Sequence, residues 1–210
     1  MKKISVLLYL CCVGFLSSAQ ACSNCDLPLH FGISADIGFT QYPNMYHQDG
    51  QSVLGRLSLQ TNYVPSDFIV LGIEAGLQNG NTMRLNLPKS TLDLLGGEPV
   101  SLIVKPLVDL LVTAQITPFE DVGFCGFIKG GVAFRQLQVD RNEVNDLSKI
   151  SPELQAGLGY KINDNLALHI EYQQVFGGDP NYQVDPLTET ASLSNIPTQK
   201  AVMLGLSLII

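Results

Sequence analysis

The feature that most limits the fold of this chain is an apolar–polar alternation with a period of two residues, repeated eight times. Between residues 31 and 42, Phe31, Ile33 and Ile37 stand at odd positions, while Gly, Ser, Asp and Thr occupy the even ones. Successive side chains of a β-strand point to opposite faces, so this pattern indicates a strand with one apolar face and one small or polar face. The predicted strands are 31–42, 53–62, 69–78, 108–116, 124–135, 150–161, 166–173 and 202–210.

The segments that join these strands alternate between short and long. Tight turns are expected at Val64–Asp67, Pro118–Asp121 and Asn163–Asn165, where Pro, Asn and Asp favour chain reversal. The long connections are 43–52, 79–105, 138–149 and 177–198. Short turns at one end and long loops at the other are typical of membrane barrels. The sequence therefore predicts an all-β fold: an eight-stranded antiparallel transmembrane β-barrel with short periplasmic turns and four longer extracellular loops.

The second face of the strands separates this fold from its main alternative, a water-soluble barrel of the lipocalin kind. A soluble barrel would turn the apolar face inward and leave the other face in water. That other face consists largely of Gly, Ser and Thr with isolated charges. Such residues pack a narrow lumen, whereas a soluble exterior is usually rich in Lys and Glu. Aromatic residues also gather near both ends of the strands, as interfacial girdles require. We therefore favour the membrane barrel.

The first 21 residues have the pattern of a cleaved signal peptide. Lys2 and Lys3 precede an apolar run that is too short to span a bilayer, and Ala19-Gln20-Ala21 is a small-x-small cleavage pattern. Lipid attachment at Cys22 is the alternative, although Ala19 stands where lipoprotein signals usually carry Leu. The expected organisation is a signal peptide at 1–21, a leader at 22–30 and an outer-membrane barrel at 31–210.

Cys22 and Cys25 form a C-x-x-C pair in the polar leader. In an exported chain this spacing predicts a local disulfide, because a thioredoxin-like redox site would lie between a strand and a helix. No second Cys or His pair has the spacing of a zinc site. We therefore expect no metal and no cofactor.

With the strands, the girdles and the signal peptide together, the chain resembles small outer-membrane barrels of the outer-membrane protein A transmembrane-domain or opacity (surface antigen) type. The resemblance covers about residues 27–210. It is carried by the segment 126–133, Gly-Phe-Ile-Lys-Gly-Gly-Val-Ala, and by Gly205, Leu208 and Ile210 at the positions of the family's assembly signal. Ile210 departs from the aromatic residue that is usual there. The resemblance implies the cell outer membrane of a Gram-negative bacterium. It also implies three partners: outer-membrane lipid, lipopolysaccharide, and the assembly machinery, which reads the C-terminal strand.

Charged residues on the inner face of the strands predict a plugged lumen. Eight strands enclose a space that side chains fill, so an open aqueous pore is not expected. Carboxylates and cations in such a lumen must pair, because an unpaired buried charge costs several kcal/mol. The expected lumen charge network consists of Glu74, Lys129, Arg135, Glu153 and Glu171.

The formal net charge of -7 and the pI near 4.8 exclude nucleic acid as a partner, because no basic footprint is present. His169 and Glu171 share one face, but the His-x-Ser pattern of lipid A deacylases is absent, so we expect no catalytic residues and no enzyme. The expected role is structural or surface-interactive, adhesin-like or antigen-like, with a host or surface ligand bound by loops such as 79–105 and 177–198. The alternatives are narrow porin-like transport of small or apolar solutes and a lipid-modifying enzyme.

Overall fold

The protein is described by a computed structural model that covers residues 29–43, 51–66, 68–84, 93, 101–119, 123–139, 146–179, 182–185 and 190–210. The signal peptide and the pair Cys22–Cys25 lie outside these residues. Within them, no helix is long and apolar enough to cross a membrane. The strands are β1 (Leu29–Gln41), β2 (Gln51–Ser66), β3 (Ile69–Gln78), β4 (Asn81–Arg84), β5 (Ser101–Val104), β6 (Leu107–Phe119), β7 (Phe124–Val139), β8 (Leu147–Lys161), β9 (Leu166–Val175), β10 (Tyr182–Asp185), β11 (Thr190–Leu193) and β12 (Gln199–Ile209).

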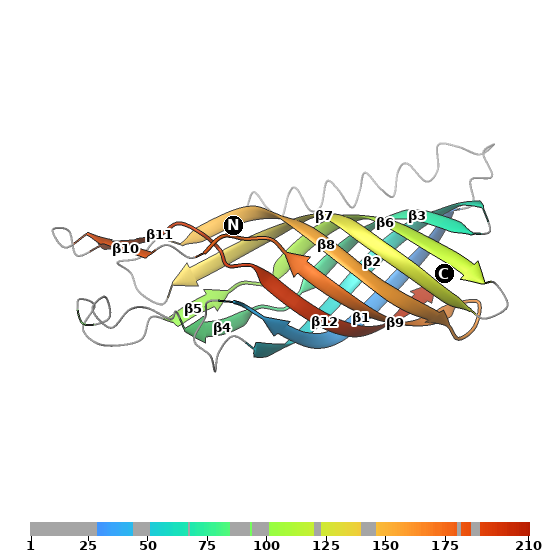
Figure 1. Ribbon diagram of the computed structural model, residues 1–210, viewed down its shortest axis with the longest axis horizontal. Helices are drawn as coiled ribbons and strands as arrows, with labels where there is room; N and C mark the ends of the chain where they lie inside the picture. The colour runs from blue at the N-terminus through green and yellow to red at the C-terminus, as the bar shows by residue number, and fades with distance from the viewer. Residues whose placement is uncertain are drawn as a thin grey trace.

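Eight long strands in the described part of the chain close into a barrel (Figure 1). Their order around the wall is β1-β2-β3-β6-β7-β8-β9-β12, and every neighbouring pair is antiparallel. The pairing of β12 with β1 completes the circle, with Leu208 opposite Ile33 and Ala201 opposite Thr40. Closure leaves no free edge among these eight strands, which is a condition for a β-structure in lipid. The eight predicted strands and the predicted barrel are confirmed.

The two ends of the barrel differ as the connection lengths predict. At the periplasmic end, Asn163 Oδ1 accepts hydrogen bonds from the backbone N–H groups of Asn165 and Leu166, which fixes the turn between β8 and β9. Gly123, before β7, has φ of 70°, a conformation that favours glycine. The strands reach further into the turns than expected, since β2 continues to Ser66 and β6 to Phe119.

At the outer end the strands are longer than a membrane crossing needs. A strand tilted by about 40° crosses a 25 Å apolar band in roughly 33 Å, whereas the 16 residues of β7 cover about 53 Å at ~3.3 Å each. The outer end of β7 pairs with β5, which pairs with β4, so this part of the wall extends beyond the band. Figure 1 shows β4, β5, β10 and β11 together at the end opposite the C-terminus. Part of the expected loops 79–105 and 177–198 is therefore strand.

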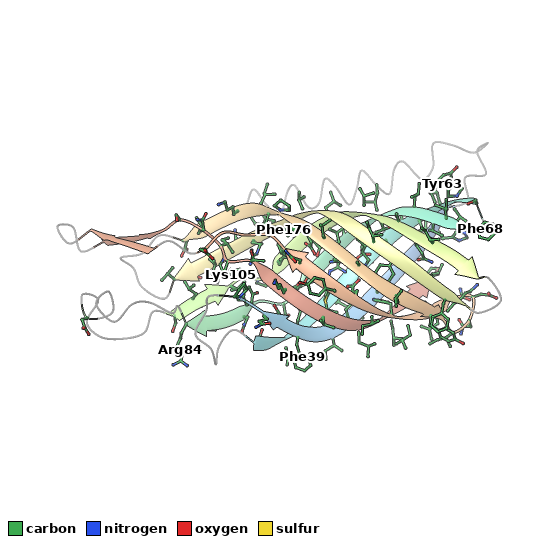
Figure 2. All side chains as sticks on the ribbon, in the orientation of Figure 1. Phe39, Tyr63, Phe68, Arg84, Lys105 and Phe176 are labelled. Carbon is green, nitrogen blue, oxygen red and sulfur yellow. The ribbon has the colours of Figure 1, made fainter. Side chains whose placement is uncertain are left out.

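The outer face of the barrel is apolar along its length. Large apolar side chains such as Ile37, Val112 and Leu158 are more than half exposed, while their polar sequence neighbours are buried. Figure 2 shows Tyr63 and Phe68 at the periplasmic end, and Phe39 and Phe176 toward the other end. These positions match two aromatic girdles around an apolar band. The inverted, water-soluble alternative is therefore excluded, because its apolar side chains would face inward.

Candidate functional site

A layer of buried charges crosses the middle of the lumen, and Arg56 of β2 lies at its centre. The guanidinium donates two hydrogen bonds to Asp109, from Nε to Oδ2 over 3.0 Å and from Nη2 to Oδ1 over 2.7 Å. Its Nη1 lies 2.6 Å from Glu74 Oε1 and 3.8 Å from Asp36 Oδ2. All four side chains are almost completely buried. One cation on β2 therefore serves three carboxylates from β1, β3 and β6, the fork geometry for which arginine is suited.

Lys129 of β7 forms the second cationic centre of the layer. Its Nζ lies 3.0 Å from Glu74 Oε2 and 3.0 Å from Glu171 Oε2. The same ammonium sits 5.1 Å from the ring centroid of Phe127, which adds a cation–π contact. Because Glu74 binds both Arg56 and Lys129, the ion pairs are continuous from Asp109 on β6 to Glu171 on β9.

A third group of contacts joins β1, β9 and β12. His169 Nε2 lies 2.6 Å from Asp36 Oδ1, and His169 Nδ1 lies 3.2 Å from Ser207 Oγ. The Phe127 ring packs edge-on against the imidazole, with ring centroids 5.9 Å apart. The strand register explains the meeting, because Asp36 stands opposite Gly205, and Gly205 stands opposite His169. Gly205 carries no side chain, so the carboxylate and the imidazole approach each other across it.

Above this charged layer, toward the outer end, the lumen holds two clusters of buried apolar side chains among buried polar ones. Leu54 and Met203 lie one inward position beyond Arg56 and Gly205, and they form a cluster with Ala201. A second cluster consists of Leu107, Ala133 and Val175. The inner face nearer the outer mouth is therefore mixed, because polar side chains such as Gln78, Arg135 and Glu153 are buried there beside the apolar clusters.

A segment before β12 lies at the outer end of the barrel. Ile196 and Pro197 are buried, and the Pro197 carbonyl accepts a hydrogen bond of 2.8 Å from Arg135 Nη1. Gly178 N–H donates to the Ile196 carbonyl over 3.1 Å, and Lys149 Nζ donates to Asn195 Oδ1 over 3.1 Å. We call residues 194–198 the cap segment. It is tied to three strands or their ends, so its position at the outer end of the barrel is fixed.

Below the charged layer a cavity of about 520 Å³ opens toward the periplasmic turns. We call it the vestibule. Its wall includes turn-proximal residues such as Gly123 and Asp164, and its floor reaches Lys129, His169 and Ser207. Cys125 also lines it and is therefore a lumen-facing thiol, a facing that the alternation of β7 did not settle because Phe127 interrupts it. The vestibule thus gives access from the periplasmic end to the charged layer.

Comparisons with known proteins bear on the fold. No protein-family model matches the chain, and a search of curated proteins finds no match. A solved structure of a major outer membrane protein from Thermus thermophilus is similar with a TM-score of 0.50 at 15% identity, over 87% of this chain and 99% of the other. Together with the apolar exterior, this likeness decides the class. The chain has the fold of a small outer-membrane β-barrel.

Two further solved structures show weaker likeness to this outer-membrane barrel. Neisserial surface protein A has a TM-score of 0.45 at 10% identity, over 86% of this chain and 96% of the other. The attachment invasion locus protein of Yersinia pestis has a TM-score of 0.43 at 14% identity, over 87% and 97% of the two chains. At these identities no function is transferred to this chain. The expected resemblance to small outer-membrane barrels is confirmed for the fold, and its lipid-facing exterior places this barrel in the outer membrane.

Of the five residues expected in the lumen network, the structure joins Glu74, Lys129 and Glu171 directly. The other two lie nearer the outer mouth and contact different groups. Arg135 holds the cap segment, and Glu153 Oε1 accepts hydrogen bonds from Gln155 Nε2 over 2.7 Å and Gln173 Nε2 over 2.6 Å. The centre of the layer is instead Arg56, with Asp36, Asp109 and His169. In the sequence, alternation places these residues on the inward face of their strands as well. Alternation does not show how far along the barrel axis each inward side chain lies, because that depends on the stagger of the strands.

Ser207 is a residue that the sequence did not single out. In the His-x-Ser pattern the serine stands two residues after the histidine on the same strand, a position that Glu171 occupies here. In the structure the hydroxyl next to His169 belongs instead to Ser207 of the neighbouring strand β12. The order of contacts differs from a serine-hydrolase triad, because here the carboxylate meets Nε2 and the hydroxyl meets Nδ1. The sequence shows only that Ser207 is a small residue on the inward face of its strand. Many other lumen residues have the same property, so it does not distinguish Ser207.

Proposed function

We propose that this outer-membrane barrel has a structural and surface-interaction role, with a closed lumen and recognition by its extracellular loops. The observation that supports the proposal is the filling of the lumen by buried side chains at successive levels: the ion pairs of Arg56 and Lys129, the apolar clusters, and the cap segment bound to Arg135. We infer that a lumen filled in this way has no continuous water path. The barrel then acts as a rigid support for what lies beyond the membrane.

The outer end supports the same role. The β4–β5 hairpin is bound to β7 and extends the wall outward, and Figure 2 shows Arg84 and Lys105 in this region, beyond Phe39 and Phe176. Strand pairing presents the connected loop from a fixed position, which reduces the ordering cost of binding. A host or surface ligand is the partner we propose there. Lipid and lipopolysaccharide would surround the apolar belt, and the assembly machinery would bind β12.

The test is a pair of measurements on the refolded full chain. In planar bilayers at 1 M KCl, we expect no stable conductance steps from the wild-type protein. Steady channels with a reproducible conductance would refute the closed-lumen part and favour narrow transport instead. Cells that display the protein should adhere to cultured epithelial cells or matrix-coated surfaces, and replacing residues 85–100 by a short Gly-Ser linker should reduce adhesion. Equal adhesion of the two, with the barrel still heat-modifiable on gels, would refute recognition by this loop.

Transport remains the second candidate because the vestibule leads from the periplasmic end to the charged layer. Conduction would need Arg56 to exchange partners and the cap segment to leave Ile196 and Pro197 exposed. A variant such as Arg135→Met, which loses the hydrogen bond to the Pro197 carbonyl, separates these ideas. If the barrel is a gated pore, this variant should conduct more often than wild type. If the apolar clusters close the lumen by themselves, it should stay silent.

A further inference from the structure

The charged layer holds more negative than positive charge. Among the described residues its carboxylates are Asp36, Glu74, Asp109 and Glu171, against the permanent cations Arg56 and Lys129. On one side of the layer, Asp36 of β1 and Glu171 of β9 approach each other through β12. Excess charge of one sign in a buried site is costly unless a further counter-charge is present.

Two carboxylate oxygens on that side lack a hydrogen-bond partner. Glu171 is only 1% exposed, and its Oε1 is a buried atom with no hydrogen bond. Asp36 Oδ2 is in the same condition, and its nearest cation is Arg56 Nη1 at 3.8 Å. Native proteins rarely leave buried acceptors without partners. These buried oxygens are therefore available to bind a positive group.

The donor atoms around this position have the composition of a metal site. One ligand atom each from Asp36, His169 and Glu171 lie within 4.8 Å of one another, and all three residues are buried. Imidazole and carboxylate ligands suit a borderline cation such as Zn²⁺, at metal–ligand distances of about 2.0–2.2 Å. Such distances place neighbouring ligand atoms roughly 3.0–3.5 Å apart. The pair Asp36 Oδ1 and His169 Nε2, at 2.6 Å, needs to separate by less than an ångström.

Ser207 supports this arrangement through the other ring nitrogen. If His169 Nδ1–H donates to Ser207 Oγ, 3.2 Å away, then Nε2 carries a lone pair that faces the Asp36 carboxylate. Without a metal, a proton on Nε2 can make this contact a hydrogen bond, and a bound cation would take the place of that proton. Metal-bound histidines generally have such a partner on the second nitrogen, which sets the tautomer.

The vestibule provides access and a source of water ligands. His169 and Ser207 line it, so the cluster is the end point of a path from the periplasm. Gly205 keeps the space between the donors open, because a Cβ there would collide with Asp36 Oδ1 and the His169 ring. We propose that Asp36, His169 and Glu171 form a binding site for one divalent cation of the Zn²⁺ class, which enters from the vestibule. The proposal is independent of the surface-interaction role and goes beyond it.

The test is zinc titration of the full chain, refolded in detergent without an affinity tag and treated with a chelator. Cys22→Ser and Cys25→Ser form the background, so that thiolates outside the barrel do not bind zinc. Calorimetry should give one Zn²⁺ per barrel, and Co²⁺ should produce visible absorption bands of a coordinated ion. Ca²⁺ at equal concentration should not compete, because it prefers all-oxygen sites.

Matched variants identify the ligands. Glu171→Gln and His169→Gln should each weaken zinc binding at least tenfold, whereas His30→Gln should not, although His30 also lines the vestibule. Glu171→Gln also removes one excess negative charge, so the metal-free barrel should remain folded by the heat-modifiability test while the zinc-dependent rise in unfolding temperature disappears. Absence of stoichiometric zinc binding by the background protein would overturn the proposal. So would equal binding by wild type and Glu171→Gln, or an equal loss in His30→Gln.

Discussion

Replacing Arg56 by Met is expected to destabilise the barrel by about 3–5 kcal/mol, the usual cost of removing one partner of a buried ion pair. The structure indicates which carboxylate causes the loss. Glu74 keeps Lys129 at 3.0 Å, and Asp36 keeps His169 at 2.6 Å. Asp109 loses both of its hydrogen bonds from the guanidinium, of 3.0 and 2.7 Å. One buried carboxylate is thereby left without its counter-charge.

Two further variants test this reasoning. Arg56→Lys keeps the charge but cannot hold Asp109 with two nitrogens, so its loss should be smaller than that of Arg56→Met. Adding Asp109→Asn to Arg56→Met removes the orphaned charge. The double variant should therefore be more stable than the single one, and the cycle should give a coupling energy of about 2 kcal/mol or more.

The assay is urea unfolding of the refolded protein in detergent, with the folded fraction read from the unboiled gel band and from circular dichroism. With an m value of about 2–3 kcal/mol/M, Arg56→Met should lower the midpoint by about 1–2 M. Unfolding and refolding curves must coincide for this conversion to hold. A midpoint within about 0.3 M of wild type, or a double variant no more stable than Arg56→Met, would refute the central place of Arg56.

Three other predictions concern the facing of side chains. Val112 is 64% exposed near the middle of β6, so Val112→Arg should lower the free energy of unfolding by about 2–4 kcal/mol. The measurement is urea unfolding in lipid vesicles, and a neutral effect would mean that this face does not contact lipid. Cys125 lines the vestibule, so a charged, water-soluble maleimide should label it in the folded barrel, whereas labelling only by an apolar maleimide would contradict the lumen facing. Gly205→Ala should lower the free energy of unfolding by about 1–3 kcal/mol, because the added Cβ would collide with Asp36 and His169. The control Gly55→Ala should be tolerated, because a Cβ at Gly55 meets nothing within 4 Å. Similar losses in both variants would count against the close approach at Gly205.

The period-two pattern was sufficient to predict the barrel wall. In β1, Ile33 and Ile37 alternate with Ser34 and Asp36, and the structure places the first pair outside and the second inside. This success has a local cause, because alternation and turn chemistry are properties of neighbouring residues. The extra length of β7 and the β4–β5 extension were not predicted, since strand pairing beyond the membrane depends on partners far apart in the sequence.

The contacts inside the lumen could not be predicted from local sequence patterns. The sequence determined that Arg56, Asp109, Lys129 and His169 point inward, and it determined the lipid-facing belt. Only the tertiary structure decided that Arg56 lies level with three carboxylates, that Ser207 of β12 meets His169 of β9, and that Arg135 holds the cap segment. The physical reason is that parity sets the face of a strand, whereas the stagger of eight closed strands sets the height at which inward side chains meet.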